Sequence, residues 1–410
     1  MKQVSIKKMT SQTIEKILKA LAAIDPKKVI ADNLALKNFA KNEFYLVAVG
    51  KGSLHFASAL ADNFPNLISG MVLDIGKPNN IDNKLTVLIG DHPLPTERNV
   101  ENSKKIVNFI EQIPNDNKIL TIVCGGSSAL LTDPINSLDK TVELYKRLLS
   151  AKLSINEINI VRKHTDRLKG GRLAEIYFPR KSLNLYVSDV PGNDLSTIGS
   201  GPTVFDRSTE IQAKKIINQL GFSNKIDTFK TPKNTDLFKN ADNQLLLSAK
   251  DLLNNLKNIF SEPLYIGENF LAKDQNQIIT DLKNLISNDY QTYIFNGESK
   301  LKVSDNPGVG GRNTHLGLKI LKEFNKNIEV IAFASDGHDN STASGAIYDL
   351  PNLKKQTTQE EINRYIENFD SYNFFKKYNS LIITGHLPVN LSDFLVINNR
   401  NWAENNKRYL

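Results

Sequence analysis

Cysteine is nearly absent from this sequence, which holds a single one, Cys124, among 410 residues. No disulfide can form within the chain, and that is typical of a protein from a reducing compartment. No run of about 18 apolar residues occurs, so no membrane-spanning helix is expected. The first residues are charged and amphipathic and lack the apolar core of a secretory signal. We therefore expect a cytoplasmic protein that does not contact a membrane.

A basic stripe is also missing, although the net charge is +8. Lysines are spread along the chain and interleaved with asparagines, and no cluster of them carries aromatic side chains. Proteins that bind nucleic acid usually have such a cluster, so we predict no nucleic-acid partner. A Lys- and Asn-rich proteome is one alternative interpretation of the charge, and a basic pocket for anionic substrates is also compatible with it.

Apolar strands that end in glycine, cysteine or serine alternate with amphipathic helices through the first half. Strands are expected at 44–50, 85–90, 118–124 and 183–188, and helices at 11–23, 53–60, 98–111, 141–153, 155–168 and 209–220. This alternation predicts an α/β fold with a parallel sheet and crossover helices. Ligands bind at the carboxyl ends of such strands, so we expect the loops there to converge on one site.

A polar segment, 224–243, is the candidate boundary between two domains, which we expect at 1–235 and 236–410. Beyond it, helices are expected at 278–286 and 313–324, and strands at 292–296, 300–303, 328–334, 380–384 and 394–397. These elements predict a second α/β domain.

Gly50-Lys51-Gly52 lies between an expected strand and an expected helix. Glycines let the backbone approach a ligand closely, and the start of a helix attracts anions. Lys51 adds a charge that could neutralise phosphoryl oxygens. A tight turn with a solvated lysine is an equally weighted alternative, since the GxxxxGK[ST] pattern of a Walker A loop is absent.

Gly125, Gly126, Ser127 and Ser128 follow the strand that ends at Cys124 and predict a second anion-binding loop. A nucleophilic Cys124 is the alternative, but a buried thiol is the preferred interpretation for a residue that closes an apolar strand.

The cation-rich run 159–172 ends in Lys169-Gly-Gly-Arg172. It predicts either an anion site that includes Lys169 or a solvated helix face, and the two interpretations are equally weighted.

Two acidic residues, Asp189 and Asp194, follow the strand 183–188 in a loop rich in glycine and proline. Asp189 could accept a proton from a substrate hydroxyl or hold Mg²⁺, and Asp194 is a second candidate ligand of the metal. Asx-turn chemistry is the alternative, but the length and composition of the loop favour a function.

In the second half, Gly297-Glu298 and Gly310-Gly311-Arg312 come close together in the chain. The two adjacent glycines precede a helix, which predicts another anion site, and Arg312 has the fork geometry for phosphate or carboxylate. A capping or surface arginine is the alternative. Asp336 follows an apolar strand and is a candidate for binding substrate or metal, and a simple turn at the end of the strand is the alternative. His338 lacks partners at metal spacing and is not predicted to be a ligand.

Taken together, these segments resemble the glycerate 2-kinase family, whose C-terminal half is called the MOFRL domain. The resemblance covers most of the chain and rests on short motifs that occur in the same order. They are Gly50-Lys51, Asp91-His-Pro-Leu-Pro95, Gly125-Gly-Ser-Ser-Ala129, Asn159-Ile-Val-Arg162, Lys169-Gly-Gly-Arg-Leu-Ala174, Ser188-Asp-Val-Pro-Gly192, Ser200-Gly-Pro-Thr203, Gly297-Glu298, Gly310-Gly-Arg-Asn313 and Ser335-Asp-Gly337.

The resemblance implies an N-terminal Rossmann-like parallel-sheet domain, a smaller C-terminal α/β domain and an active site in the cleft between them. It implies that ATP, with Mg²⁺, phosphorylates the 2-hydroxyl of D-glycerate. The family's active-site lysine falls on Lys51 and its active-site arginine on Arg312. We expect Lys51, Arg312 and Asp189 to be catalytic, and Asp189, Asp194 and Glu298 to lie near the metal. Residues expected to bind substrate or nucleotide are Gly50, Gly125, Gly126, Ser127, Ser128, Lys169, Asp194, Gly297, Glu298, Gly310, Gly311 and Asp336.

Three segments depart from the family's usual pattern. They are Gly192-Asn-Asp194 in place of Gly-Asp-Asp, Asp336-Gly-His-Asp-Asn-Ser-Thr342 in place of Asp-Gly-x-Asp-Gly-Pro-Thr, and Gly385-His-Leu-Pro-Val-Asn-Leu-Ser-Asp393 in place of Gly-Pro-Thr-Gly-Thr-Asn-Val-x-Asp. A related hydroxy acid as substrate, hydroxypyruvate reductase activity and a non-catalytic sensor of small molecules therefore stay open. The loop at 50–55 lacks the third glycine of a dinucleotide fingerprint, which disfavours the reductase.

Overall fold

The computed structural model describes residues 12–77, 81–151, 153–260, 263–287 and 289–402. The chain forms two compact units. One unit comprises Pro26–Ser248 and is called the central unit here. The other comprises the residues up to Asp25 together with Ala249–Leu410. We call it the terminal unit because both ends of the chain belong to it.

The central unit is built on a six-stranded parallel sheet in the order β3-β2-β1-β4-β5-β6. The strands are β1 (Phe44–Val49), β2 (Leu67–Asp74), β3 (Leu85–Ile89), β4 (Lys118–Val123), β5 (Ser182–Ser188) and β6 (Ala241–Ser248). Residue Ala48 of β1 pairs with Val72 on one side and Ile122 on the other. The strand order changes direction between β1 and β4, which is where ligands bind in open α/β sheets.

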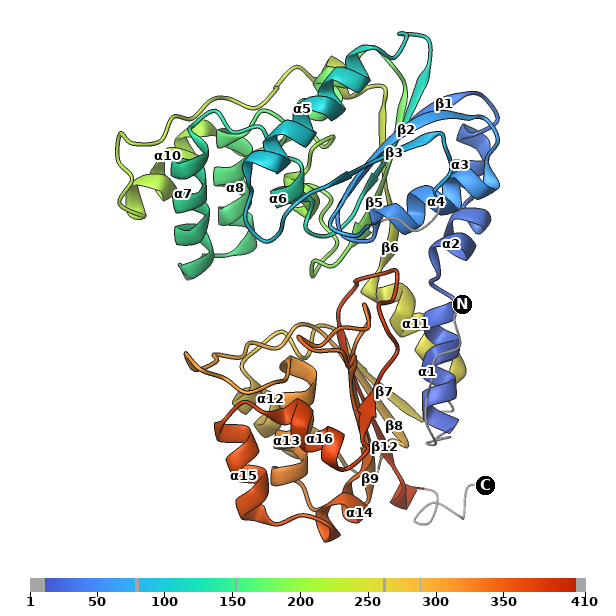
Figure 1. Cartoon of the computed structure of the whole chain (residues 1–410), viewed down its shortest axis with the longest axis vertical. Helices are drawn as coiled ribbons and strands as arrows, with labels where there is room; N and C mark the ends of the chain where they lie inside the picture. The colour runs from blue at the N-terminus through green and yellow to red at the C-terminus, as the bar shows by residue number, and fades with distance from the viewer. Residues whose placement is uncertain (1–11, 78–80, 152, 261–262, 288, 403–410) are drawn as a thin grey trace. The chain divides into compact units, whose positions relative to one another are not determined.

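Helices cover both faces of this sheet (Figure 1). On one face lie α2 (Pro26–Asp32), α3 (Leu34–Phe39) and α4 (Ser53–Asn63), and on the other lie α5 (Glu97–Glu111), α6 (Ser127–Leu130), α7 (Leu138–Ser150), α8 (Ile155–Thr165), α9 (Arg172–Tyr177) and α10 (Glu210–Gln219). Two short 3₁₀ turns are η1 (Ile198–Ser200) and η2 (Thr235–Phe238). Alternation along β1 turns Val47 and Val49 toward Ile106 and Ile110 of α5, in one apolar core.

The terminal unit contains a second six-stranded sheet, which is mixed and has the order β11-β10-β9-β12-β8-β7. Only β7 and β8 are parallel among its neighbouring strands. The strands are β7 (Leu264–Gly267), β8 (Thr292–Asn296), β9 (Ile328–Ala334), β10 (Gly345–Asp349), β11 (Leu381–Ile382) and β12 (Asp393–Asn399).

Helices also lie on both faces of the second sheet (Figure 1). One face carries α1 (Gln12–Ala22) and α11 (Ala249–Ile259), which pack on each other, and the other carries α12 (Gln275–Leu285), α13 (Arg312–Glu323), α14 (Leu350–Lys355), α15 (Gln359–Glu367) and α16 (Ser371–Lys377).

The predicted fold class is confirmed: a parallel α/β sheet is followed by a second α/β sheet. One predicted strand, 300–303, is wrong, because Lys300 makes only an isolated backbone bridge with Asp274. The division of the chain also differs from the predicted one between 235 and 236. Strand β6 lies beyond that point but pairs with β5 and completes the first sheet. The start of the predicted first helix, at residue 11, lies outside the described residues.

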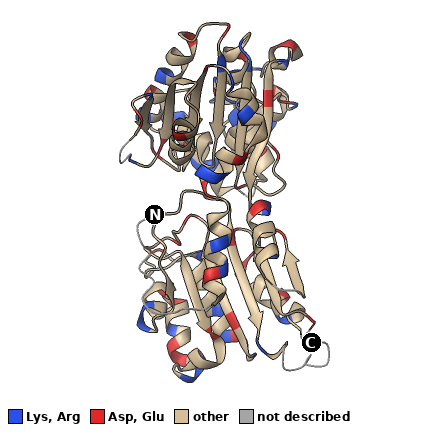
Figure 2. Cartoon of the chain, turned by 90° about the vertical axis from the view of Figure 1, so that its right-hand side faces the viewer, with Lys and Arg blue, Asp and Glu red and all other residues tan. Residues whose placement is uncertain are grey.

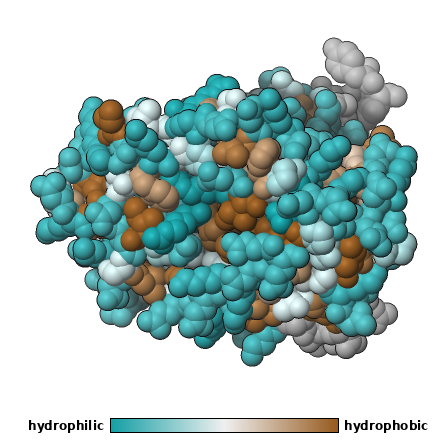
Figure 3. Space-filling model, turned by 90° about the horizontal axis from the view of Figure 1, so that it is seen from above, coloured by the Kyte–Doolittle hydropathy of each residue, from teal (hydrophilic) through white to brown (hydrophobic). Residues whose placement is uncertain are grey.

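The surface of the protein is charged and mixed. Figure 2 shows Lys and Arg interspersed with Asp and Glu on both units, so the positive net charge is not gathered in one stripe on the face drawn. Figure 3 shows hydrophilic side chains over most of the face seen from above, with hydrophobic ones in separate patches. Among the described residues, no helix is both long and apolar enough to cross a bilayer.

Candidate functional site

Two glycine loops meet where β1 and β4 end. The backbone N–H of Lys51 donates to the carbonyl of Gly125 at 2.8 Å. Gly50 has a φ of 119°, and a Cβ there would lie 2.5 Å from the Cys124 carbonyl oxygen, so only glycine fits. The two loops that were predicted to converge are therefore neighbours.

The side chains of Lys51 and His92 lie together against Gly126. A Cβ at Gly126 would lie 3.2 Å from Lys51 Cγ and 3.1 Å from His92 Cδ2. Lys51 is half-buried, and no side chain or carbonyl among the described residues accepts a hydrogen bond from its ammonium. Burial, then the positive charges of Lys51 and Arg162, lower the pKa of His92 to about 4. The imidazole is therefore neutral near pH 7 and leaves the positive charge at this point to Lys51.

Asp189 lies against Gly125 of the same glycine loop. A Cβ at Gly125 would overlap its carboxylate, so the missing side chain of Gly125 makes room for Asp189. Asp189 is half-buried and directly follows β5 in the chain. The structure thus brings Lys51, the Gly125–Gly126 turn and Asp189 to one edge of the sheet, as the sequence predicted.

Cys124 is buried beneath this turn. Burial, with the negative charges of Asp74 and Asp189, raises the pKa of its thiol. A thiol that stays protonated is a poor nucleophile, which supports the interpretation as a packing residue.

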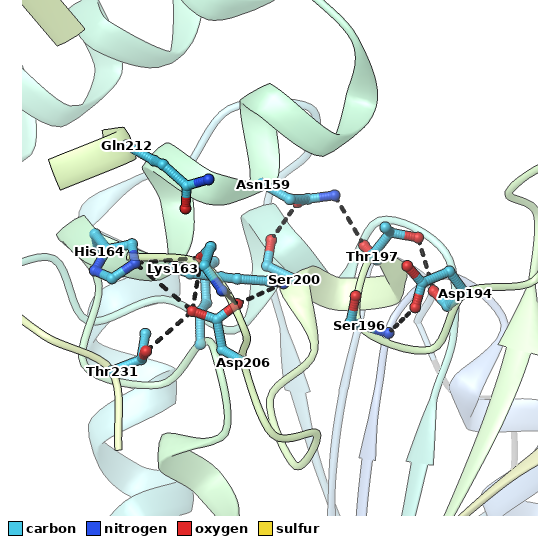
Figure 4. Close-up of polar contacts among 12 residues, drawn as sticks. Asn159, Lys163, His164, Asp194, Ser196, Thr197, Ser200, Asp206, Gln212 and Thr231 are labelled. Carbon is cyan, nitrogen blue, oxygen red and sulfur yellow. Dashed lines mark hydrogen bonds and ion pairs between the residues drawn. The ribbon is translucent and has the colours of Figure 1, made fainter. Parts of the chain in front are cut away.

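The two serines of the turn have different surroundings. Ser127 is 2% exposed, and its hydroxyl has no hydrogen-bond partner among the described residues. The Ser128 hydroxyl lies 2.9 Å from that of Ser200, which donates to Asn159 at 2.8 Å. Asn159 in turn donates to the Thr197 carbonyl at 3.2 Å, and these links between α8 and η1 are visible in Figure 4. This chain of polar groups fixes the position of Ser128.

Two predicted anion sites at helix starts receive the protein's own carboxylates instead. Asp74, 2% exposed, accepts from the Leu54 N–H at the start of α4 at 2.9 Å. Asp339 accepts from the N–H groups of Asn313 and Thr314 at 2.9 and 2.8 Å at the start of α13. A Cβ at Gly311 would overlap the carbonyl of Asp339. These N–H groups are therefore engaged by carboxylates of the protein itself.

Most of the cation-rich run 159–172 is internal to the central unit. Lys169, predicted to bind substrate, is 1% exposed, and its ammonium donates to Asp166 at 2.6 Å and to the Leu131 carbonyl at 2.9 Å. Lys163 pairs with the buried Asp206 at 3.2 Å. Because its positive charge is paired with Asp166 inside the fold, the Lys169 ammonium is engaged in holding the chain at Leu131 rather than in binding a ligand.

Figure 4 shows the network around Asp206, which Lys163, His164 and Thr231 surround. Near it, Asp194 is exposed and its carboxylate accepts from the Ser196 N–H at 2.9 Å, in an Asx turn. Both acids line a pocket of about 520 Å³ on this side of α8. Asp194 therefore has the local hydrogen bond that the Asx-turn alternative expected.

In the terminal unit, Arg312 lies between two carboxylates. Its Nη1 is 3.0 Å from Glu298, and its Nε is 3.1 Å from Asp393. Burial lowers the pKa of Arg312, but Asp393 and then Glu298 outweigh it and raise the pKa overall. Burial raises the pKa of Asp393 to about 7, an effect that Arg312 only partly opposes. Glu298, predicted near the metal, is thus the partner of the predicted catalytic arginine.

The remaining predicted residues lie in loops of the terminal unit. Gly297 has a φ of 128° and follows β8. Asp336 follows β9, is half-buried and accepts from the His338 N–H at 3.0 Å. Gly310 lies against Ser371.

Sequence reasoning did not assign a role to His92, Arg162 or Asp393. The first lies in the motif that begins at Asp91, and the second ends the motif 159–162, so each had a signal in the resemblance. The partnership of Asp393 with Arg312 has no local signal, because the two residues are far apart in the sequence.

Comparison with known proteins identifies relatives over nearly the whole chain. Residues 13–229 match a family described as a domain of unknown function, DUF4147, and residues 291–393 match the MOFRL family. A D-glycerate 2-kinase of Thermotoga maritima is 29% identical over 96% of this chain and 98% of its own. A glycerate 2-kinase of Sulfurisphaera tokodaii is 30% identical over 94% and 98%.

Two solved structures share the fold. A glycerate kinase from Thermotoga maritima superposes with a TM-score of 0.80 at 27% identity, covering 94% of this chain and 98% of its own. A protein from Pyrococcus horikoshii superposes with a TM-score of 0.76 at 22% identity, covering 94% and 97%. The second likeness concerns the fold alone.

Proposed function

The chain belongs to the glycerate 2-kinase family, and from that premise we propose that it transfers the γ-phosphoryl group of ATP to the 2-hydroxyl of D-glycerate. The products are 2-phosphoglycerate and ADP. The observation that carries this proposal is the grouping of Lys51, the Gly125–Gly126 turn and Asp189 at the ends of β1, β4 and β5. Phosphoryl transfer depends on positioning and on stabilisation of charge, and a cation and a carboxylate beside two tight backbone turns suit both needs. We place the reaction in the cytoplasm, the compartment that supplies ATP.

Lys51 is proposed to neutralise phosphoryl oxygens. Its ammonium has no internal acceptor among the described residues, and its neighbour His92 is neutral at pH 7 because its pKa is about 4. The full charge of the lysine is therefore available to a bound anion. Charge held in place before the reaction stabilises the transition state without any cost of reorganisation.

Asp189 is proposed to orient the 2-hydroxyl and to accept its proton. Its carboxylate is half-buried against Gly125, and a carboxylate within hydrogen-bond reach of a hydroxyl can act as its base. The same group fits Mg²⁺, which binds one or two carboxylates and completes its shell with phosphates and water. Bound there, Mg²⁺ would neutralise charge on the phosphates. Asp194 accepts a hydrogen bond from Ser196 and Glu298 pairs with Arg312, and all three carboxylates are proposed to lie near the metal.

Arg312 is proposed to stabilise the transferred phosphoryl group. Its guanidinium is held by Glu298 and Asp393, and two such contacts limit its rotation and keep it charged. Planar arginine donors match phosphate oxygens in pairs. Lys51 belongs to the central unit and Arg312 to the terminal unit.

The test is an ADP-release assay with ATP, Mg²⁺ and D-glycerate, with the product identified by NMR. Lys51→Ala should lower kcat about 10²–10³-fold, as loss of one preorganised donor does elsewhere. Lys105→Ala is the matched control, since Lys105 is exposed on α5. Near-normal turnover in Lys51→Ala would remove Lys51 from the mechanism, and 3-phosphoglycerate as product would refute the proposed position of transfer.

A related hydroxy acid is the second candidate substrate. The segment 385–393 departs from the family pattern and packs on the loop after β9, where the Ser335 hydroxyl accepts from the N–H groups of Leu391 and Ser392. A panel of small 2-hydroxy acids in the same assay distinguishes the candidates. Binding of acid and ATP without turnover would instead favour a sensor.

A further inference from the structure

Arg162 on α8 is a buried cation without an internal acceptor. The residue is 9% exposed, and its Nε is fully buried and makes no hydrogen bond. Within the described part of the chain, no carboxylate or carbonyl pairs with its guanidinium, which lies over the ring of Tyr145 at 5.0 Å. Burying a charge is costly unless it is paired. The negative charge of Asp166 acts on Arg162 but makes no direct ion pair with it, so the donors of the guanidinium are left for an anion from outside the chain.

The other buried cations of the segment 159–172 have partners inside the fold. Lys163 pairs with Asp206 at 3.2 Å, and Lys169 pairs with Asp166 at 2.6 Å. The guanidinium of Arg172 donates to three backbone carbonyls, those of Lys163, Lys169 and Lys230. The fold therefore satisfies the other buried cations of this run and leaves the donors of Arg162 available.

Arg162 belongs to the neighbourhood of the glycine turn. Its charge, together with that of Lys51, lowers the pKa of His92, and His92 lies against Gly126. One helical turn before Arg162, Asn159 is linked through Ser200 to Ser128 at the end of that turn. Arg162 and Lys51 are thus the two cations that influence the same imidazole, one from α8 and one from the loop after β1.

Tyr145 adds a second unused donor beside the guanidinium. Its hydroxyl is buried and has no partner among the described residues. Burial raises the pKa of Tyr145, so the hydroxyl keeps its proton and can donate it. Arg162 and Tyr145 therefore each keep a buried donor without an acceptor in the described part of the chain, whereas buried donors are normally paired.

We propose that Arg162, with the Tyr145 hydroxyl beside it, binds the carboxylate of the acid substrate. The inference rests on the proposed phosphorylation of a hydroxy acid. It adds the residue that distinguishes an acid from an uncharged analogue. A carboxylate carries the single negative charge that would balance Arg162, and its two oxygens match the planar fork of a guanidinium. The phosphates of ATP remain for Lys51 in the glycine loop.

Binding without ATP tests this inference apart from the kinase reaction. Calorimetry with D-glycerate should show binding to the wild type and a loss of affinity of about 10–100-fold in Arg162→Gln, in keeping with the removal of one charged hydrogen-bonded pair. Arg147→Gln on the exposed side of α7 is the matched control and should bind as the wild type does. No binding of D-glycerate by the wild type, or equal binding by Arg162→Gln, overturns the inference even if ADP is released.

The neutral amide of D-glycerate gives a second test that needs no variant. The wild type should prefer the acid over the amide by about 10–100-fold, and Arg162→Gln should lose most of that preference. In turnover, Arg162→Lys should raise the KM for glycerate and leave the KM for ATP unchanged. A raised KM for ATP with intact preference for the acid assigns Arg162 to the phosphates and overturns the proposal. If Arg162→Gln does not fold, equal use of acid and amide by the wild type overturns it as well.

Discussion

Protonation of the Asp393 carboxyl affects the stability of the protein and removes the charge from one of the two partners of Arg312. The pKa of Asp393 is raised from 3.8 to about 7 in the folded protein because it is buried. The folded state therefore keeps a proton that the unfolded chain releases near pH 4, and its contribution to the unfolding free energy falls as pH rises toward 7. The loss is on the order of 1.4 kcal/mol for each unit of pKa difference.

Asp393→Asn should remove this pH dependence. Urea unfolding at several pH values between about 4 and 7 would show a steeper fall of stability in the wild type than in the variant. The variant should also turn over more slowly at neutral pH, because Arg312 then has only Glu298 as a charged partner. Parallel stability curves for the two proteins would mean that Asp393 titrates as an ordinary carboxyl.

Cys124 is predicted to be unreactive toward thiol reagents in the folded protein. Its thiol is buried and its pKa is raised, so a thiol reagent should label it only after unfolding. Cys124→Ala should keep kcat within about twofold, since the change removes one small buried group that does not touch substrate. Rapid labelling of the native protein, or loss of turnover in the variant, would restore the nucleophile alternative.

At the scale of elements, α13 depends on a carboxylate that is distant in sequence. Asp339 accepts from Asn313 and Thr314 at the first turn of the helix. Asp339→Ala should lower the unfolding free energy by about 1–3 kcal/mol, because the cap is lost and buried N–H donors lose their acceptor. Because α13 begins at Arg312, turnover should fall as well.

Chemical denaturation measures this effect, and Asp116→Ala is the comparison. Asp116 is exposed, and its removal should change stability by less than about 0.5 kcal/mol. Equal stability of Asp339→Ala and the wild type would show that water satisfies the helix start and that the site is open to an outside anion.

Several elements were predictable from sequence because each shows one strong pattern. The apolar runs of β1, β4 and β9 end in glycine- or serine-containing loops, and all three were predicted. Strand β2 (Leu67–Asp74) was missed, because Ser69 and Gly70 interrupt its apolar pattern. Tertiary packing, which buries Gly70 against Leu46 and Leu85, decides the structure of such a segment.

The candidate site was predictable only in part for a similar reason. The position of Lys51, Gly125 and Asp189 follows from the rule that parallel strands bring their carboxyl ends to one edge. The rule does not predict which charged groups pair with other residues inside the fold. Lys169 and Arg162 look alike in sequence, yet Lys169 is paired with Asp166, whereas Arg162 has no hydrogen-bond acceptor among the residues that the structure describes. Likewise, no local sequence pattern predicts that the carboxylates of Asp74 and Asp339 accept hydrogen bonds at the starts of α4 and α13.

For the whole molecule, the unit boundaries make a prediction about independent folding. We propose that a fragment of residues 26–248 folds alone, since it contains the complete sheet from β3 to β6. A fragment of residues 26–235, cut at the boundary expected from composition, lacks β6 and exposes the edge of β5. Circular dichroism and cooperative urea unfolding should separate the two. Cooperative folding of the shorter fragment would show that β6 is dispensable.

Both ends of the chain belong to the terminal unit, and the central unit is inserted between Asp25 and Ala249. A stretching force applied to the two ends is therefore borne first by the terminal unit. As long as that unit holds, the points of insertion stay fixed and no tension reaches the parallel sheet that carries Lys51 and Asp189. In a single-molecule pulling experiment the terminal unit should rupture first, and the central unit should extend only afterwards.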